Sequence, residues 1–311
     1  MGMSQIDETK LWNTAFSTPM MMDAYEWATR LIMGGHTGGV LYAPTRTGKT
    51  KTIELMVEEL KQFQGPRSPI ESGTAWVVAR DRLVMSEGGF WDWLLQEFGH
   101  QAAGLRSSPS VKRHLVYEYV KGLARSSPSG RLILFVDEAQ ILVLVELGWF
   151  ADLFNALNKD GFELILFLVG SYHLREWIQE LAGKRHEHVR SRFFANEHRL
   201  TGLRTLSHFQ RCLRRFDVDR SLLQGKGSIT EFYLPEWYGS GGRLEKQADL
   251  FRQGFKQVAP MQDFEVPMAY FIRAVRQVLN DGVPSDLEQF KDIVTDTGYL
   301  KVKLTLDGLP A

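Results

Sequence analysis

The chain has 311 residues, of which 44% are hydrophobic and 24% are charged, a composition typical of a globular protein with one large domain or two modest ones. Lysine plus arginine and aspartate plus glutamate each number 37, so the formal net charge of zero argues against a constitutively basic nucleic-acid binder, though not against a local basic stripe. The one cysteine, Cys212, excludes an internal disulfide and favours a reducing, cytoplasmic location. The sequence has no secretory signal pattern and no apolar run long enough to cross a membrane, so no membrane span is expected.

Strands and helices alternate along most of the chain. The expected helices cover residues 20–32, 49–63, 90–98, 111–124 and 149–157. The expected strands cover 38–42, 74–79, 131–137, 162–169 and 197–200. From about residue 205 the pattern is helical only. Alternating strands and helices predict a parallel sheet covered on both faces.

The segment 43–50 reads APTRTGKT and lies between an expected strand and an expected helix. This is the context of a phosphate-binding loop, because backbone N–H groups at the turn and the helix start converge on a triphosphate. Lys49 would reach the β- and γ-phosphates, and the Thr50 hydroxyl would bind Mg²⁺. Ala43 replaces the usual first glycine, which is tolerable if this residue ends the strand with a negative φ. The expected nucleotide-binding residues are Ala43, Pro44, Thr45, Arg46, Thr47, Gly48, Lys49 and Thr50.

Two carboxylates, Asp137 and Glu138, stand at the end of the third apolar strand. A continuous apolar run is typical of a strand buried on both faces of a parallel sheet, and doubly wound sheets bind ligands at the carboxyl ends of their strands. We expect Asp137 to hold the Mg²⁺, largely through water, and Glu138 to polarise the attacking water. A solvated turn is the alternative interpretation of this pair.

The order of these features resembles the AAA+ ATPases: a phosphate loop, a strand ending in DE, a polar residue after the fourth strand, and arginines before the fifth. The resemblance spans about residues 30–280 and implies an α/β fold, a doubly wound, parallel, five-stranded sheet with a smaller C-terminal helical lid. It also implies that Ser171, as the first sensor, contacts the γ-phosphate or its water. The expected parts are a helical lead-in (1–36), an ATPase core (37–204), a helical lid (205–285) and a C-terminal tail (286–311).

The segment 187–194, EHVRSRFF, resembles the box that carries the arginine finger in this family. A finger brings positive charge to the γ-phosphate bound by a neighbouring subunit, where the transition state spreads negative charge. Arg192 is the first candidate and Arg190 the second, with solvated arginines at a helix end as the alternative. Residues 239–244, GSGGRL, resemble the second sensor of origin-recognition-like members, in which Arg243 would touch the nucleotide; a plain helix start is the alternative.

Within the AAA+ ATPases, a compact chain with DEAQ and an SRF box is most similar to the TnsC/TniB transposition regulators, which are related in core to IstB and to helicase loaders. Members of that group bind ATP, assemble as rings or helical filaments on double-stranded DNA and pass a marked target site to a transposase. The resemblance therefore implies a slow, DNA-stimulated ATPase that acts as a switch, with ATP and Mg²⁺ as cofactors. The implied partners are further copies of the chain, double-stranded DNA, a transposase and a target-selection protein.

Basic residues after the second strand and before the third are the candidates for DNA contact, because these segments face the bore of such a filament. Lys112 and Arg113 open a helix beside a serine that could cap it, so both could bind phosphates regardless of sequence. An ordinary solvated charged face is the alternative. The candidates are Arg80, Arg82, Lys112, Arg113 and Lys121.

Two other classes of AAA+ protein stay open as alternatives. A STAND-like defence or signalling ATPase would activate an effector by oligomerising, but 311 residues leave no room for a large sensor domain. An assembly factor of the helicase-loader or clamp-loader type is the other, although no zinc-finger cysteines or long partner-binding extension support it.

Overall fold

The computed structural model describes residues 17–62, 64–65, 68–69, 73–82, 85–181, 191–221, 223, 225–260 and 263–299. The chain divides into two compact units, which we describe separately. One unit, here called the sheet unit, comprises Asp23–Pro44 and Lys49–Leu200. The other, here called the helical unit, comprises Thr45–Gly48 together with the described parts of Met1–Met22 and Thr201–Ala311.

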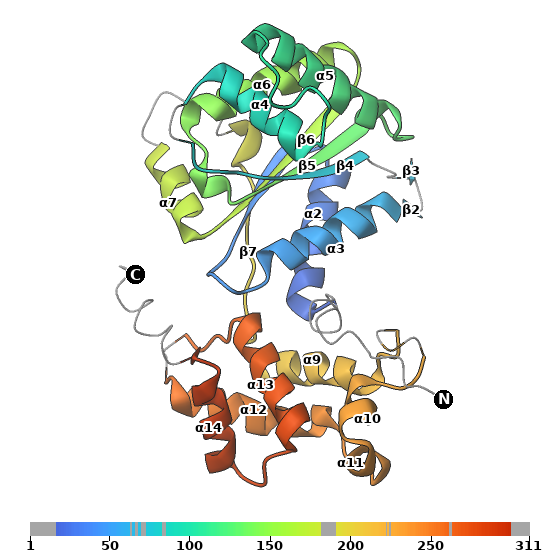
Figure 1. Cartoon of the computed structure of the whole chain (residues 1–311), viewed down its shortest axis with the longest axis vertical. Helices are drawn as coiled ribbons and strands as arrows, with labels where there is room; N and C mark the ends of the chain where they lie inside the picture. The colour runs from blue at the N-terminus through green and yellow to red at the C-terminus, as the bar shows by residue number, and fades with distance from the viewer. Residues whose placement is uncertain are drawn as a thin grey trace. The chain divides into compact units, whose positions relative to one another are not determined.

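Five parallel strands form the centre of the sheet unit, in the order β4-β5-β6-β1-β7 (Figure 1). The predicted five-stranded parallel α/β sheet is confirmed. The strands are β1 (Gly38–Tyr42), β4 (Gly73–Val78), β5 (Arg131–Asp137), β6 (Glu163–Gly170) and β7 (Glu197–Arg199). Tyr42 of β1 is in register with Gly170 of β6, and Val136 of β5 is in register with Leu168. The carboxyl ends of β1, β5 and β6 therefore meet at one edge of the sheet.

Helices cover both faces of this sheet, as its apolar strands require. One face carries α4 (Glu87–Glu97), α5 (Pro109–Arg125), α6 (Leu144–Lys159) and α7 (Tyr172–Leu181), and the other carries α2 (Pro19–Met33) and α3 (Lys49–Gln62) (Figure 1). Successive strand residues point to opposite faces, so Leu134 packs in the cluster under α4 to α7 while Phe135 does not. On the second face the ring of Phe167 stacks on Phe135 at 5.3 Å and contacts Trp27 of α2 at 5.6 Å.

Helix α6 begins five residues earlier than the sequence pattern predicts, at Leu144 rather than Trp149. The residue before the helix, Val143, has no polar side chain that could cap the first turn. Glu146 in the first turn supplies the missing partner, because its carboxylate accepts a hydrogen bond from the backbone N–H of Val143 at 3.0 Å. Helix α7 was not predicted, nor were the short antiparallel strands β2 (Gln64–Gly65) and β3 (Ser68–Pro69) and the 3-10 helix η1 (Ala139–Ile141).

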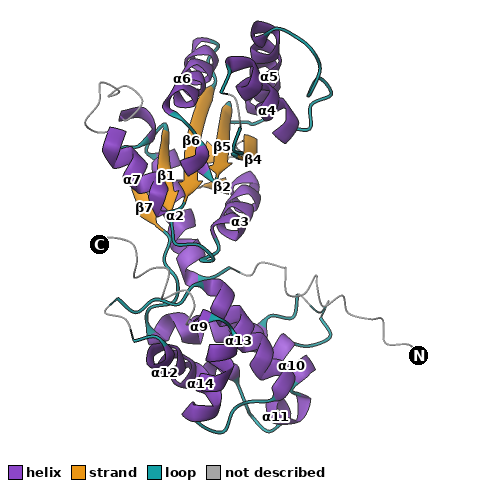
Figure 2. Ribbon diagram, turned by 60° about the vertical axis from the view of Figure 1, so that its left-hand side comes forward, coloured by secondary structure: helices purple, strands orange, loops and turns teal. Residues whose placement is uncertain are grey.

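The helical unit is built from helices and connecting loops (Figure 2). Its elements are α9 (Leu206–Val218), α10 (Ile229–Tyr233), α11 (Pro235–Gly239), η2 (Leu244–Gln247), α12 (Ala248–Val258), α13 (Met268–Asp281) and α14 (Leu287–Asp296). The segment expected as a C-terminal tail, from residue 286, contains helix α14. Phe290 of α14 is buried, with its ring 4.5 Å from that of Phe251. A Cβ on Gly254 would lie 2.3 Å from the Phe290 ring, so glycine lets α14 pack closely on α12.

Residues Thr45–Gly48 belong to the helical unit through contacts of Arg46. Its carbonyl oxygen accepts a hydrogen bond from Ala269 N–H at 3.1 Å, and its guanidinium donates to the Tyr270 hydroxyl at 2.6 Å. These contacts hold Arg46 in the left-handed region, at φ 65°. No sequence pattern pointed to Tyr270, because a ring that contacts a loop more than 200 positions away leaves no local signature.

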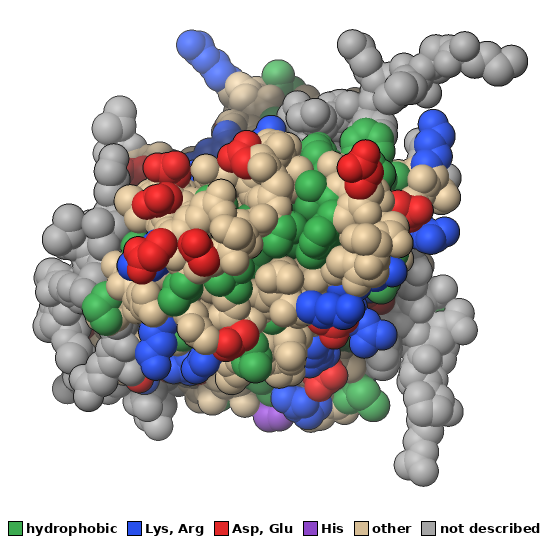
Figure 3. Space-filling model, turned by 90° about the horizontal axis from the view of Figure 1, so that it is seen from below, with side chains coloured by type: hydrophobic (Ala, Val, Ile, Leu, Met, Phe, Trp, Pro, Cys, Tyr) green, Lys and Arg blue, Asp and Glu red, His purple; other side chains and the backbone are tan. Residues whose placement is uncertain are grey.

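The surface of the described residues mixes side chains of every kind. The face seen from below in Figure 3 carries acidic, basic and apolar side chains together, as a net charge of zero allows. No helix in the described ranges is long and apolar enough to cross a membrane.

Cys212 is fully buried on α9, where burial raises the pKa of its thiol to about 12. Cys212 thus packs as a small apolar residue. Because the thiolate is the reactive form, a buried thiol with a raised pKa reacts only when its surroundings open.

We expect Cys212 to react with a chromogenic disulfide reagent at least about 100-fold more slowly in the native protein than in the same protein unfolded in urea. The measurement is the absorbance of the released thiolate over time at one pH. The unfolded chain is the control, since it exposes the same single thiol. A native rate equal to the unfolded one would contradict the packing of α9.

Candidate active site

The phosphate loop leaves β1 with ordinary backbone geometry. The N–H of Ala43 donates to the carbonyl of Gly170 at 3.1 Å, so Ala43 continues the pairing of β1 with β6 by one residue. Ala43 is fully buried and does not have a positive φ. The methyl group in place of the usual glycine hydrogen therefore causes no backbone strain.

Further along the loop, the backbone of Gly48 has a φ of 107°. A Cβ added at Gly48 would meet no atom within 4 Å, so the backbone conformation rather than space favours glycine there. In the described part of the chain, Arg46 and Glu138 are the two non-glycine residues with positive φ. Both belong to segments predicted to surround a nucleotide, and strained backbone concentrates at such sites.

Lys49 is the first residue of α3, and its side chain is nearly fully buried. Its ammonium donates to the carbonyl oxygens of Pro44, at 3.2 Å, and Ala43, at 3.4 Å. Burial lowers the pKa of Lys49, and the nearby carboxylates of Glu138 and Asp137 oppose this shift. A buried ammonium that is held by two neutral carbonyls is stabilised by an anionic partner such as a phosphate.

Thr50 and Asp137 lie in direct contact, although they are far apart in sequence. The Thr50 hydroxyl donates to Asp137 Oδ2 at 2.9 Å, and Asp137 Oδ1 accepts from the N–H of Glu138 at 2.9 Å. Burial raises the pKa of Asp137, and the hydrogen bonds from Glu138 and Thr50 oppose this shift. A hydroxyl and a carboxylate are oxygen ligands of the kind that Mg²⁺ prefers, so the two residues fit the ion predicted for them.

Glu138 follows β5 in the left-handed region, with φ 54° and ψ 33°. Its carboxylate accepts a hydrogen bond from Nε2 of Gln140, and Oε1 of Gln140 accepts from the N–H of Ser171 at 3.0 Å. The Ser171 hydroxyl is buried and has no hydrogen-bond partner among the described residues. Ser171 follows β6 directly, so the sheet brings the predicted sensor to the same edge as Asp137 and Glu138.

Sequence reasoning missed Gln140. The DEAQ pattern held the signal, because an amide two residues after a carboxylate can donate to it when the chain turns there. The turn itself, made by the left-handed Glu138 and by η1, was not foreseen.

Of the two arginine-finger candidates, Arg192 lies in the described part of the chain. Arg190 lies outside the described residues. Arg192 is half-buried, with its guanidinium carbon 4.6 Å from the centre of the Phe154 ring on α6. Its carbonyl oxygen accepts a hydrogen bond from the Thr37 hydroxyl at 2.5 Å, which ties this segment to the start of β1.

Arg243 is held within its own loop in the helical unit. Its guanidinium donates to the carbonyls of Tyr238, at 2.9 Å, and Gly242, and lies 3.7 Å from the centre of the Tyr238 ring. The carboxylate of Asp217 caps the helix that follows, accepting from the N–H groups of Leu244 and Glu245. The loop therefore has the contacts of an ordered helix start, and the nucleotide contact of Arg243 stays a prediction.

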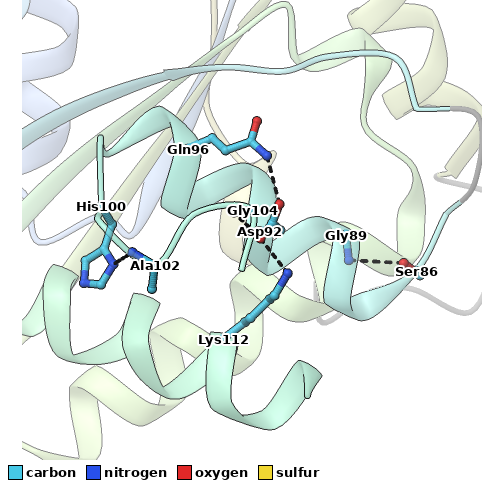
Figure 4. Close-up of polar contacts among 8 residues, drawn as sticks. All are labelled: Ser86, Gly89, Asp92, Gln96, His100, Ala102, Gly104 and Lys112. Atoms are coloured by element: carbon cyan, nitrogen blue, oxygen red, sulfur yellow. Dashed lines mark hydrogen bonds and ion pairs between the residues drawn. The ribbon is translucent and has the colours of Figure 1, made fainter. Parts of the chain in front are cut away.

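Three of the five basic DNA candidates are largely buried in ion pairs. Lys112 donates to Asp92 at 2.5 Å, and the same carboxylate accepts from Gly104 N–H and from Gln96, which closes the turn between α4 and α5 (Figure 4). Lys121 pairs with Asp160, and Arg82 pairs with Glu146. The side chains of the three are only 12% to 18% exposed.

The other two candidates reach the surface. The side chain of Arg80 is 61% exposed and pairs with Glu97 at 2.6 Å, and that of Arg113 is 51% exposed and lies 3.5 Å from Glu87. The pair of Arg113 with Glu87 is exposed on both sides and contributes about 0–1 kcal/mol, so Arg113 can exchange its carboxylate for another anion at little cost. The Glu97 side chain is only 10% exposed, but it also accepts a hydrogen bond from the N–H of Val78 at 2.9 Å, so it keeps a partner if Arg80 turns to another anion. Arg113 also lines a cleft next to α6.

Residues 32–178 match the model of a protein family described as AAA domain. A search of curated proteins finds no match. Among solved structures, Cdc6p from Pyrobaculum aerophilum is similar in fold, with a TM-score of 0.53 and 13% identity over 89% of this chain and 66% of that chain. ORC2 from Aeropyrum pernix has a TM-score of 0.47 and 9% identity, over 95% of this chain and 98% of that one. Domain III of the replication initiation protein DnaA from Thermotoga maritima has a TM-score of 0.46 and 14% identity, over 94% and 99% of the two chains.

The chain thus spans 66% of the length of the Cdc6p chain, and identities this low show likeness of fold alone. The family match covers the phosphate loop, Asp137, Glu138 and Ser171. The likeness to an AAA domain, a P-loop domain of the kind that binds and hydrolyses ATP, thus extends over residues 32–178.

Proposed function

We propose that the chain is an ATP-switched, DNA-binding oligomer that marks a site on double-stranded DNA and recruits a transposase, with slow ATP hydrolysis as the release step. The observation that carries the ATP-dependent part is the meeting of Lys49, Thr50, Asp137 and Glu138 at one edge of the sheet. The DNA and transposase parts rest on the resemblance of the DEAQ and SRF segments to the TnsC/TniB regulators.

Each residue of the site has one task in this proposal. Lys49 binds the terminal phosphates, while Thr50 and Asp137 hold Mg²⁺ through hydroxyl and carboxylate oxygens. When bound, the ion neutralises negative charge that develops on the phosphates. Glu138 accepts a proton from the attacking water. The Ser171 hydroxyl, which has no hydrogen-bond partner among the described residues, donates to a γ-phosphate oxygen or to that water.

The site is complete only between two subunits if Arg192 is an arginine finger. Its stacking on Phe154 contributes about 0.5–1 kcal/mol, which is lost when the guanidinium leaves the ring. A charge-assisted contact with the γ-phosphate on a neighbouring subunit offsets this loss. ATP binding would then favour assembly, and hydrolysis would remove the anion that holds the interface together.

Glu138→Gln is expected to keep ATP bound and to lose at least about 100-fold in turnover, because Lys49, Thr50 and Asp137 remain while the water loses its base. Its complexes with duplex DNA should outlast those of the wild type. Phosphate release measures the first effect, and electron microscopy with duplex DNA and ATP measures the second. Lys49→Ala is the matched control and should lose both ATP binding and assembly.

Wild-type turnover of the Glu138→Gln protein would show that another residue positions the water. DNA binding that is equal with and without ATP would contradict the switch. A STAND-like ATPase would assemble without DNA, and a helicase- or clamp-loader type factor would assemble on DNA but would not retain a transposase in a pull-down.

The exposure of the basic residues makes Arg80 and Arg113 the proposed phosphate contacts. The double variant Arg80→Ala/Arg113→Ala should weaken binding to all duplex sequences and reduce the log–log salt slope by about two units, one for each lost contact. Fluorescence anisotropy over a salt series measures the slope.

Lys112→Met is the matched control. It removes a positive charge from α5, the helix that also carries Arg113, but Lys112 is already paired with Asp92. This variant should leave the salt slope unchanged. The opposite pattern, a changed slope for Lys112→Met and none for the double variant, would overturn the assignment.

Arg192→Ala is expected to bind ATP nearly as wild type but to hydrolyse it at least about 100-fold more slowly, if the residue serves a neighbouring subunit. Mixing Arg192→Ala protein with Lys49→Ala protein should restore activity, because some interfaces then pair an intact loop with an intact finger. Wild-type specific activity should also rise with protein concentration. Turnover that is independent of concentration, with no rescue on mixing, would identify a monomeric ATPase instead.

A further inference from the structure

The amide group of Gln140 bridges two parts of the candidate active site. Its nitrogen donates to the carboxylate of Glu138, and its oxygen accepts from the backbone N–H of Ser171 at 3.0 Å. The two ends of one side chain thus connect the residue after β5 with the residue after β6. Both polar atoms of the amide are used, which fixes the orientation of the group.

Strand β6 ends in Gly170, which lies against the side chain of Gln140. A Cβ on Gly170 would lie 2.4 Å from Oε1 of Gln140 and 2.9 Å from a methyl group of Leu174. The φ of Gly170 is not positive, so its backbone conformation does not favour glycine. The absent side chain instead leaves room for the amide of Gln140.

Glu138 itself is tied at two points. Its N–H donates to Asp137, and its carboxylate accepts from Gln140, while its backbone is in the left-handed region. The direction of the carboxylate therefore depends on the one side-chain contact that reaches it from η1. An amide donor engages one carboxylate oxygen and leaves the other able to accept a proton from water.

We propose that Gln140 is a positioning residue for ATP hydrolysis, which acts through Glu138 and aligns it with Ser171. The inference rests on the proposed roles of Glu138 as base and Ser171 as sensor. Because one amide holds both, a shift of the β6 end on phosphate binding would be passed to the Glu138 carboxylate. Gln140 does not touch the phosphates in this arrangement, so its loss should alter turnover and not affinity.

Two replacements of Gln140 by side chains of nearly equal length remove one or both of its hydrogen bonds. Gln140→Glu keeps an acceptor for Ser171 N–H but loses the donor to Glu138, whereas Gln140→Met loses both. We expect each to lower kcat by about 10- to 100-fold, since misplacement of a catalytic group by about 1 Å has effects of that size. The dissociation constant for ATP, measured with a fluorescent analogue, should stay within about twofold of the wild-type value.

The decisive measurement repeats both replacements in Glu138→Gln protein. If Gln140 acts through Glu138, neither replacement should lower the residual single-turnover rate by more than about twofold, because residues that act as one unit are not additive. Gly170→Ala should mimic Gln140→Met, since its methyl group takes the place of the amide. Gln96→Met, which removes an amide that bonds to Asp92 on α4, is the matched control and should leave kcat unchanged.

Unchanged kcat in Gln140→Glu and Gln140→Met proteins, beside a hydrolysing wild type and an inactive Glu138→Gln protein, would overturn this inference and leave the proposed ATPase site intact. Equal losses in the wild-type and Glu138→Gln backgrounds, or a matching loss of ATP affinity, would also overturn it. Absence of hydrolysis in the wild type would instead count against the proposed function. Thermal unfolding of each variant checks that it folds.

Discussion

Strand β6 sets the geometry of the whole site, because it pairs with β1 on one side and with β5 on the other. Parallel pairing gives all three strands the same direction, so the phosphate loop after β1, the carboxylates after β5 and Ser171 after β6 emerge at one edge. The hydrogen bond from Thr50 to Asp137 then spans this edge from the start of α3. A shift of β6 by a single residue would move Ser171 away from Gln140 and turn the β6 side chains to the opposite faces of the sheet.

The same edge concentrates features that oppose folding. Lys49 and Asp137 are charged groups largely withdrawn from water, and Glu138 has a left-handed backbone. Burial of such groups costs free energy unless partners are present, and their pKa values shift in the directions that disfavour the charged forms. A site built this way gains stability when an anionic ligand and a cation arrive together, which links nucleotide binding to the stability of the sheet unit.

Much of this edge could be predicted from local sequence, because apolar runs, a GKT loop and a DE pair leave local signatures. Strands β1, β5 and β6 followed from such patterns, which also assigned Thr50 and Asp137 to one site. Partners chosen by tertiary packing could not be predicted: Asp92 for Lys112, Glu146 for Arg82, and Gln140 for Ser171. Helix α14 was not distinguished from the expected C-terminal tail for the same reason, since Phe290 is recognisable as a core residue only beside Phe251.

The ion pair between Arg82 and Glu146 affects how a substitution of Arg82 is interpreted. Glu146 is fully buried, caps the start of α6 through Val143, and lies against a guanidinium that also stacks on Trp93 at 4.8 Å. Removing one member of a buried pair typically costs about 3–5 kcal/mol, because the remaining charge is left without a partner. Arg82→Ala protein would therefore lose DNA binding because it no longer folds. An alanine scan that measures DNA binding alone would wrongly rank Arg82 among the strongest DNA ligands.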